Sequence, residues 1–345
     1  MNRYNERLST LCSIGPTVRA LLKGCCSGLA DGAGPAAVLS AMDLERLPPQ
    51  ISGILALEAA AADYAGVPAG AIPRLRGIVK YAHTLYAGMT AGLCALGQLC
   101  NNASLPVLLP DSTAIRFGYS IPLRQHTWTA ELSVPAEHYA HFLSLAREAG
   151  CCVTATRFGA TIKRQNTEAV LIRKNTSAKA FLWEGAEPVR IGGTDFLRPE
   201  KNRLLVSLLE DGFLLLRSAN PGSRLVSWTL DMHAASSGAD WKTVAALAAG
   251  RGSARQLRVM LEVYQTLSLQ PLGEDVLSFF PSRQETESLV QLLEASRTAL
   301  ERKHRIRRHW YIARLESADN SAAKALPLFC RGILRTLWLR LTPVR

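Results

Sequence analysis

The sequence predicts an α+β protein in which a small mixed β-sheet is flanked by N-terminal and C-terminal helical regions. Residues 74–101 place apolar side chains at three- and four-residue steps, the period of an amphipathic helix. Residues 105–175 instead contain short segments rich in β-branched residues, which favour strands. The expected organisation is four consecutive segments: a helical region 1–100, an α/β core 101–200, a helical region 201–300 and a basic amphipathic tail 301–345.

The N-terminal region is dominated by one long expected helix, residues 74–101. Pro73 precedes it as part of a turn, and Asn101-Asn102 is a plausible end. An Ala-rich helix is also expected over residues 51–64. The face of the long helix that should be buried carries Ile78, Tyr81, Ala82, Leu85, Met89, Leu93, Leu96 and Leu99.

The segment 105–175 predicts the order strand, short helix, strand, helix, strand, strand, which is a small α/β unit. Pro135 suits the first turn of a helix over residues 136–149, which should end at Gly150. Further helices are expected at 204–216 and 241–267. The expected strands are residues 105–109, 127–134, 151–157 and 168–173.

Composition excludes several classes of protein. Hydrophobic residues make up 48% of the 345 residues, enough for a sizeable core and too many for a disordered chain. No run of about 18 uncharged apolar residues occurs, so no membrane-spanning helix is expected, and MNRYNERLSTLC lacks the apolar stretch of a signal peptide. The eight cysteines include Cys25-Cys26 and Cys151-Cys152 but no C-x-x-C spacing, which favours buried, reduced thiols. These features predict a cytoplasmic protein.

The net charge of +12 is concentrated near the C-terminal end. Residues 301–345 hold eleven Lys and Arg and three acidic residues, so they carry +8, and residues 1–300 carry the remaining +4. A terminal helix that packs its Leu face on the core would explain this tail. Otherwise it suits a protein or peptide partner, then an anionic membrane surface, and least of all nucleic acid. The candidate partner-binding residues are Arg305, Arg307, Arg308, Arg331, Arg335 and Arg340.

An ordered series of motifs spans the core and the following helices: Leu105-Pro106-Val107-Leu108-Leu109, Tyr119, Arg124, Thr129-Ala130-Glu131-Leu132-Ser133-Val134-Pro135, Gly150, Trp228 with Asp231, Asp240-Trp241, and Gly252 with Arg255. In this order and spacing, residues 74–300 resemble the bacterial nucleotidyltransferase-like family, a branch of the polymerase-β-type minimal nucleotidyltransferase superfamily. The resemblance implies a nucleotidyltransferase-like mixed-sheet core. It also implies transfer of a nucleoside monophosphate from an NTP to a hydroxyl-type acceptor, with Mg²⁺ as cofactor.

The chain departs from the family pattern where that family carries its chemistry. The family's phosphate-cradling Lys-Gly turn corresponds to Pro110-Asp111, where Pro has no backbone N–H and Asp would repel a triphosphate. The two metal-binding aspartates of the family correspond to Thr129 and Glu131. Thr is neutral, and Mg²⁺ demands close octahedral geometry that the longer Glu fits less well.

If the site is active, the resemblance assigns catalysis and Mg²⁺ binding to Glu131 and Glu168, and nucleotide binding to Ser112 and Arg124. Structural explanations remain open for each residue. Glu131 and Glu168 suit solvated strand charges, Asp111-Ser112 suits the cap of a short helix, and Arg124 suits an ion pair. Other residues of the pattern suit structural roles. Asp231 and Trp241 would hold the helical half against the core, and Trp128 would fill the space that a metal site would have used.

Three functions therefore remain open. The chain is a degenerate nucleotidyltransferase-like accessory protein that binds a partner, an active Mg²⁺-dependent nucleotidyltransferase, or an unrelated helical adaptor. Phosphoryl-type transfer depends on positioning and charge neutralisation, and one electrostatic donor alone is worth about 3–4 kcal/mol. The missing phosphate turn and metal anchor therefore favour the accessory protein. Related accessory proteins often occur in bacterial biosynthetic clusters, including those for modified peptides, which implies the same setting here.

Overall fold

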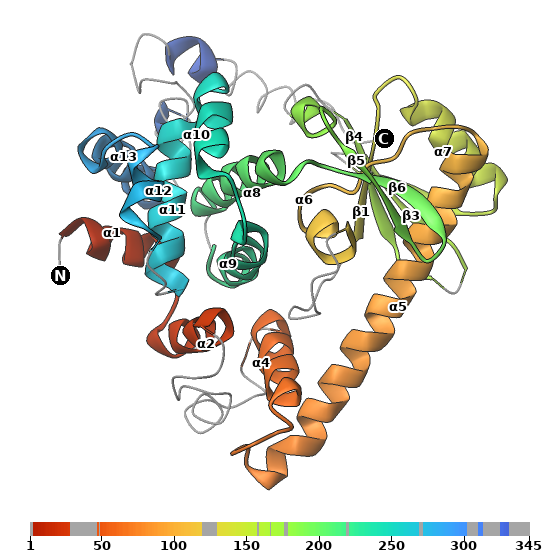
Figure 1. The fold of residues 1–345 in the computed structure, drawn as a ribbon, viewed down its shortest axis with the longest axis horizontal. Coiled ribbons are helices and arrows are strands. Elements are labelled where there is room, and N and C mark those ends of the chain that lie inside the picture. Colours follow the sequence, from red (N-terminus) through yellow and green to blue (C-terminus); the bar gives the residue numbers. More distant parts are fainter. Residues whose placement is uncertain are drawn as a thin grey trace. The chain divides into compact units, whose positions relative to one another are not determined.

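The described part of the chain folds as an α+β protein, with helices, a four-stranded sheet and a two-stranded sheet (Figure 1). The structure is a computed structural model. Within the residues that it describes, no helix has the length and apolar character needed to cross a membrane. The described residues are 3–27, 47, 49–118, 130–156, 159–165, 167–175, 179–218, 221–268, 272–301, 310–312 and 325–330.

Several expectations fall outside the described residues. These are the strand positions 127–129, the nucleotide-binding candidate Arg124 with Tyr119 and Trp128, and all six candidate arginines of the tail. Two short pieces of the tail are described, residues 310–312 and 325–330, and both are helical. The ring of Trp310 meets the ring of Phe329 edge-on, with centroids 5.4 Å apart.

The four-stranded sheet is mixed and has the order β1-β4-β3-β2. Strand β1 runs parallel to β4, with Glu131 opposite Leu171 and Ser133 opposite Arg173. Strand β3 is antiparallel to both β4 and β2. The sequence predicts three of these strands but misses β3. The four strands are β1 Ala130–Val134, β2 Cys152–Thr156, β3 Gly159–Lys163 and β4 Val170–Lys174.

Residues 105–109 form isolated bridges instead of the expected strand. Leu108 pairs antiparallel with Ser133 on β1 and parallel with Leu197 on β6, so this segment links the two sheets. The two-stranded sheet consists of antiparallel strands β5 (Glu187–Ile191) and β6 (Thr194–Arg198), which the sequence analysis did not predict. Leu105, Val107, Leu108 and Leu109 are buried, which explains why the apolar run is needed here.

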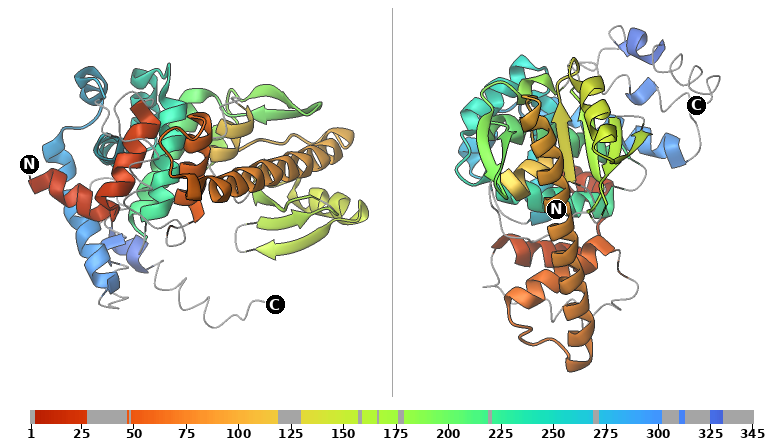
Figure 2. Two further views of the ribbon diagram at one scale, coloured as in Figure 1. Left: turned by 90° about the horizontal axis from the view of Figure 1, so that it is seen from below. Right: turned by 90° about the vertical axis from the view of Figure 1, so that its right-hand side faces the viewer.

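The long predicted helix is α5 (Ile72–Asn102), and its C-terminal half runs between the two sheets in both views of Figure 2. Small residues permit this close packing. A Cβ at Gly92 would lie 2.8 Å from the Glu168 carbonyl, and one at Gly97 would lie 2.5 Å from the Phe196 ring. The N-terminal half of α5 packs instead on α4 (Pro49–Ala61), where Ala56, Ala59, Val67 and Leu75 form a small core.

The buried face of α5 agrees with the prediction only in part. Ala82, Leu85, Met89, Leu93 and Leu96 are buried as expected. Tyr81 is 53% exposed, and Ile78 and Leu99 are half-buried. The difference arises because the two halves of the helix pack on different partners, and a single periodic stripe in the sequence does not reveal that change.

Helix α7 (Tyr139–Glu148) follows β1 and buries Phe142 and Ala146. Gly150 follows its end with φ +76°, a left-handed backbone that favours glycine. The backbone N–H groups of Gly150 and Cys151 close the helix by donating to the Arg147 and Ala146 carbonyls. The expected end of this helix is therefore confirmed. Gly150 is suited to this position because it adopts the left-handed backbone that ends the helix.

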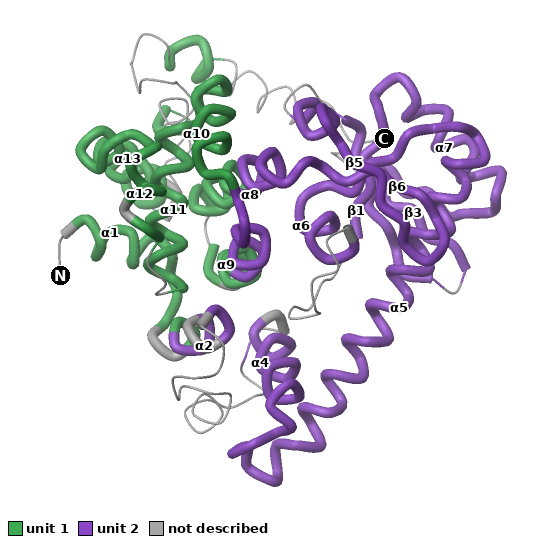
Figure 3. Tube along the Cα trace, viewed as in Figure 1, with its two compact units in different colours: residues 1–19, 209–229, 240–345 green, residues 20–208, 230–239 purple. Residues whose placement is uncertain are grey.

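The chain divides into two compact units, each assembled from segments that are distant in the sequence (Figure 3). Unit 1 comprises residues 1–19, 209–229 and 240–345, and unit 2 comprises residues 20–208 and 230–239. This division cuts across the four consecutive segments expected from the sequence. The reason is long-range packing, since helix α1 (Arg3–Cys12) contacts helices near the other end of the chain.

Unit 1 is helical in its described residues. The expected helix 241–267 is broken in two at Arg251–Ser253, where Gly252 has φ +70°. Glu210 stabilises this break, because its carboxylate accepts hydrogen bonds from Arg251 and from Ser253 Oγ, at 2.8–2.9 Å.

The other helices of the chain complete unit 1 or lie partly in unit 2. They are α2 Pro16–Ser27, α8 Lys201–Leu216, α9 Gly222–Ser236, α10 Trp241–Gly250, α11 Ala254–Ser268, α12 Glu274–Ser278 and α13 Arg283–Glu301, of which α2, α8 and α9 lie partly in unit 2.

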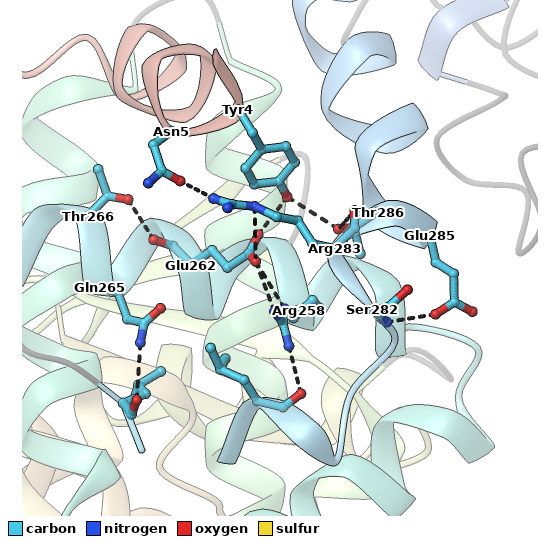
Figure 4. Close-up of polar contacts among 12 residues, drawn as sticks. Tyr4, Asn5, Arg258, Glu262, Gln265, Thr266, Ser282, Arg283, Glu285 and Thr286 are labelled. Atoms are coloured by element: carbon cyan, nitrogen blue, oxygen red, sulfur yellow. Dashed lines mark hydrogen bonds and ion pairs between the residues drawn. The ribbon is translucent and has the colours of Figure 1, made fainter. Parts of the chain in front are cut away.

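A buried polar network joins α1, α11 and α13 within unit 1 (Figure 4). The Glu262 carboxylate accepts hydrogen bonds from Tyr4 Oη at 2.6 Å and from the Arg258 guanidinium at 3.1 Å. Arg283 lies with its guanidinium carbon 4.2 Å from the centre of the Tyr4 ring. Burial, followed by the hydrogen bond to Glu262, raises the pKa of Tyr4. The network fixes the N-terminal helix on the C-terminal helices, a structural role.

Candidate functional site

The candidate site is built around the turn that follows residues 105–109 in unit 2. This turn comprises the short helix α6 (Asp111–Thr113) and a π-helical turn, Ala114–Gly118. Phe117 stacks on Tyr86 of α5 with ring centroids 4.9 Å apart. The turn also carries four polar residues that each contact another part of the same unit: Asp111, Ser112, Thr113 and Arg116. The turn therefore brings separate parts of the chain into one cluster.

Asp111 opens this turn and is held by two side chains. Lys179 Nζ lies 3.3 Å from Asp111 Oδ1, and the hydroxyl of Ser207, on α8, donates to the same oxygen. Lys179 also contacts Ser207 Oγ. Burial acts to raise the pKa of Asp111, but the Lys179 ammonium, the Ser207 hydroxyl and the Arg173 charge outweigh it and hold that pKa below its usual range. Asp111 is therefore a largely covered carboxylate that stays ionised.

Ser112 and Arg116 meet Asp231, which is contributed by α9. Ser112 Oγ donates to Asp231 Oδ2 at 2.6 Å, and Arg116 Nη2 lies 3.6 Å from Asp231 Oδ1. Asp231 is only 4% exposed. The Trp-x-x-Asp segment therefore places its acid against the turn. This placement agrees with the structural role expected for Asp231.

Glu131 is paired with Arg173 across the parallel strands β1 and β4. The Arg173 guanidinium binds both carboxylate oxygens, with Nη2 2.9 Å from Oε1 and Nε against Oε2. The backbone N–H of Glu131 donates to Thr113 Oγ1 at 3.0 Å, which ties β1 to the turn. A carboxylate that is held by a guanidinium in this two-pronged manner has a strong, geometrically fixed partner.

Glu168 lies apart from Glu131. It precedes β4 and packs on α5, where its backbone N–H donates to the Gly88 carbonyl at 3.3 Å. In the sheet register Glu131 faces Leu171, and its carboxylate turns to Arg173, still further from Glu168 along β4. The structure does not bring the two expected metal ligands together. Among the described residues no three His, Cys, Asp or Glu side chains form a group that could hold a metal ion.

The expectation that Asp111-Ser112 caps α6 is wrong. The N-cap position is Pro110, whose side chain makes no capping hydrogen bond, and both side chains turn to other partners. Sequence reasoning found Asp111, Ser112 and Glu131 but missed Lys179, Ser207 and Arg173. Asp231 was found, although its contact with Ser112 was not. No motif marks Lys179 or Ser207, because their role arises only when the chain folds.

Each of the three acids at this site is joined to a base. Asp111 is joined to Lys179, Glu131 to Arg173, and Asp231 to Arg116. No family model, curated protein or solved structure matches this chain. Interpretation of the site therefore depends on these contacts.

Proposed function

We propose that this chain is a nucleotidyltransferase-like protein that has lost metal-dependent catalysis and acts as an accessory protein by binding a protein or peptide partner. The observation that carries the proposal is the pairing of acids with the chain's own bases. Glu131 stands where the family has a metal-binding Asp, and Arg173 binds it. Asp111 stands in the phosphate turn, and Lys179 binds it.

The order of elements supports the nucleotidyltransferase-like part of this proposal. An extended segment, residues 105–109, precedes the short helix α6, and β1 follows in a mixed sheet. This is the order that the family resemblance implies. It also counts against the unrelated helical adaptor, for which no mixed sheet would be expected over residues 105–175.

The residues present fit Mg²⁺ poorly. Magnesium requires hard oxygen ligands in near-octahedral geometry. Both oxygens of Glu131 already bind a guanidinium, and Glu168 precedes β4 and packs on α5. Recruiting Glu131 to a metal ion would either require release of Arg173 or place two cations beside one carboxylate. This repulsion favours the accessory function over the active enzyme.

Calorimetry with ATP or GTP and Mg²⁺ tests the loss of catalysis. We expect the full chain to show no binding tighter than about millimolar. Micromolar, Mg²⁺-dependent binding that disappears in Glu131→Ala would show an active site instead. Glu187→Ala is the matched control, because Glu187 also pairs with an arginine of a neighbouring strand, Arg198, which donates twice to its Oε2 on the other sheet. That control should bind nucleotide as the unaltered chain does.

The tail remains the expected contact for an acidic partner. Its arginines lie outside the described residues, so their role is proposed from sequence alone. Replacing Arg331, Arg335 and Arg340 with Glu in the full chain should abolish binding to a fluorescent poly-glutamate peptide. Phosphatidylglycerol vesicles and duplex RNA serve as comparison ligands. Preferential binding to either would replace the protein partner by a membrane surface or a nucleic acid.

A further inference from the structure

The surroundings of Asp111 have the chemistry of an anion-binding site. The Lys179 ammonium lies 3.3 Å from its carboxylate, and the Ser207 hydroxyl donates to the same oxygen. Ser207 is fully buried, and the Asp111 side chain is 18% exposed. An ammonium and a hydroxyl around a partly dehydrated position are groups that bind phosphate oxygens in proteins.

The backbone at Asp111 is held in an unfavourable conformation. Its φ is +43°, in the left-handed region that glycine adopts without steric cost and that other residues adopt only occasionally. Asp is among the residues that adopt this region more often than most, with its short side chain in a hydrogen-bonding interaction. Here that interaction is the contact of the carboxylate with Lys179 and Ser207.

We propose that Asp111 is the internal occupant of an anion site formed by Lys179 and Ser207, and that its carboxylate closes this site to free phosphate. The side chain supplies the negative charge that a phosphate group would otherwise bring. The inference depends on these contacts and on the backbone of Asp111. It holds whether or not the chain descends from a nucleotidyltransferase.

Opening the site by substitution gives a direct test. In Asp111→Gly the carboxylate is removed and the left-handed backbone becomes unstrained. We expect the full-length variant to bind inorganic phosphate, without added metal, at least about tenfold more tightly than the unaltered chain. Calorimetry measures this, and phosphate should also raise the melting temperature of the variant, because a ligand that binds only the folded state stabilises it.

Two controls separate the site from general effects. Asp63→Gly removes another Asp with positive φ, +47°, that lies exposed in the turn after α4, and it should leave phosphate binding unchanged. Adding Lys179→Met to Asp111→Gly should abolish the gain, because the ammonium is the main charge facing the opened position. Asp111→Asn provides a second variant that keeps the side-chain volume and tolerates the left-handed backbone.

The outcomes are distinct. The proposal is overturned if folded Asp111→Gly and Asp111→Asn bind phosphate no better than the unaltered chain, or if the unaltered chain binds it equally well. If both variants unfold in phosphate-free buffer, phosphate at about 10 mM should restore folding by ligand linkage, and failure to do so also overturns it. The nucleotide calorimetry described above uses the unaltered chain with Mg²⁺, so the two proposals can fail separately.

Discussion

At the scale of single residues, three acids that are largely shielded from solvent each lie beside a base. Asp231 faces Arg116, Asp111 faces Lys179, and Glu262 faces Arg258. Dehydration of an isolated carboxylate is costly, and a nearby cation with hydrogen-bond donors offsets that cost. Such pairs contribute little net stability compared with apolar groups, but removal of one partner leaves the other dehydrated without compensation.

Glu262 should therefore be sensitive to substitution. Glu262→Gln keeps the side-chain volume but removes the charge that faces Arg258 and Arg283, so we expect the free energy of unfolding to fall by about 3 kcal/mol. Glu287→Gln is the control. Its carboxylate contacts Arg7 at 3.6 Å, its side chain is 51% exposed, and its loss should change stability by less than about 1 kcal/mol. Urea unfolding measures both, and equal effects would contradict the structural role of the network.

Because two thiols are buried, we expect the free energy of unfolding to fall at alkaline pH. Burial raises the pKa of Cys12 and of Cys100 to about 12, whereas an unfolded thiol titrates near about 8.5. The stabilising effect is complete below the unfolded pKa and is lost as pH rises toward 12, because the unfolded chain releases protons that the folded chain retains. Each thiol should contribute a decline of about 1.4 kcal/mol per pH unit in this window.

Urea unfolding under reducing conditions between pH 8 and 10.5 checks this dependence. The double variant Cys12→Ala and Cys100→Ala should show a shallower decline than the unaltered chain. Identical slopes would mean that these thiols ionise equally in the folded and unfolded states. Cys152, which is exposed, should react readily with a thiol reagent in the folded protein and so serves as the labelling control.

At the scale of elements, α5 shows how one helix serves two environments. Its N-terminal half packs on α4, and its C-terminal half lies between the sheets. The glycines of the second half are therefore packing residues, even though glycine weakens an isolated helix. Gly77 of the first half has nothing within 4 Å of where a Cβ would stand, so close packing does not require glycine there.

Alanine substitutions at these two glycines should have opposite signs. Gly97→Ala would place a methyl group 2.5 Å from Phe196 and 2.7 Å from Thr194, both buried, and should destabilise by about 1–3 kcal/mol. Gly77→Ala meets open space and should stabilise by about 0.5–1 kcal/mol through helix propensity. Thermal unfolding of the two variants compares them directly. Stabilisation by Gly97→Ala would mean that β6 does not approach α5 as closely as the structure has it.

The sequence analysis missed the three strands β3, β5 and β6. Strands β3 and β5 include glycine or proline, which reduce the expected strand propensity. Their pairing with neighbours far along the chain or across a tight turn supplies the stability instead. The long helix α5 was predicted closely because its signal is local and repeated over many turns.

At the scale of the whole molecule, unit 1 is completed by the first helix of the chain. Leu8, Leu11 and Cys12 of α1 are buried, and Tyr4 reaches Glu262. The contacts of α1 are with α11 and α13, which lie more than two hundred residues later. Removal of α1 would expose apolar surface on both helices and leave Glu262 without the Tyr4 hydroxyl.

Deletion of residues 1–14 should therefore destabilise the C-terminal helices. We expect faster amide hydrogen exchange in α11 and α13, with little change in β1 to β4, because local opening follows lost packing. Hydrogen exchange with mass spectrometry measures this difference by segment. Uniform protection in the truncated chain would show that α1 is dispensable for unit 1. The variant Tyr4→Phe keeps the apolar packing and should show a smaller effect confined to the Glu262 network.

The sequence alone determined the α+β class and the positions of α5, α7 and α8. These features follow from local periodicity and residue chemistry. Only the tertiary structure decided which base accompanies each acid: Lys179 for Asp111, Arg173 for Glu131 and Arg116 for Asp231. The physical reason is that charges 42 to 115 residues apart interact only after folding, and nothing in their local sequence specifies the partner.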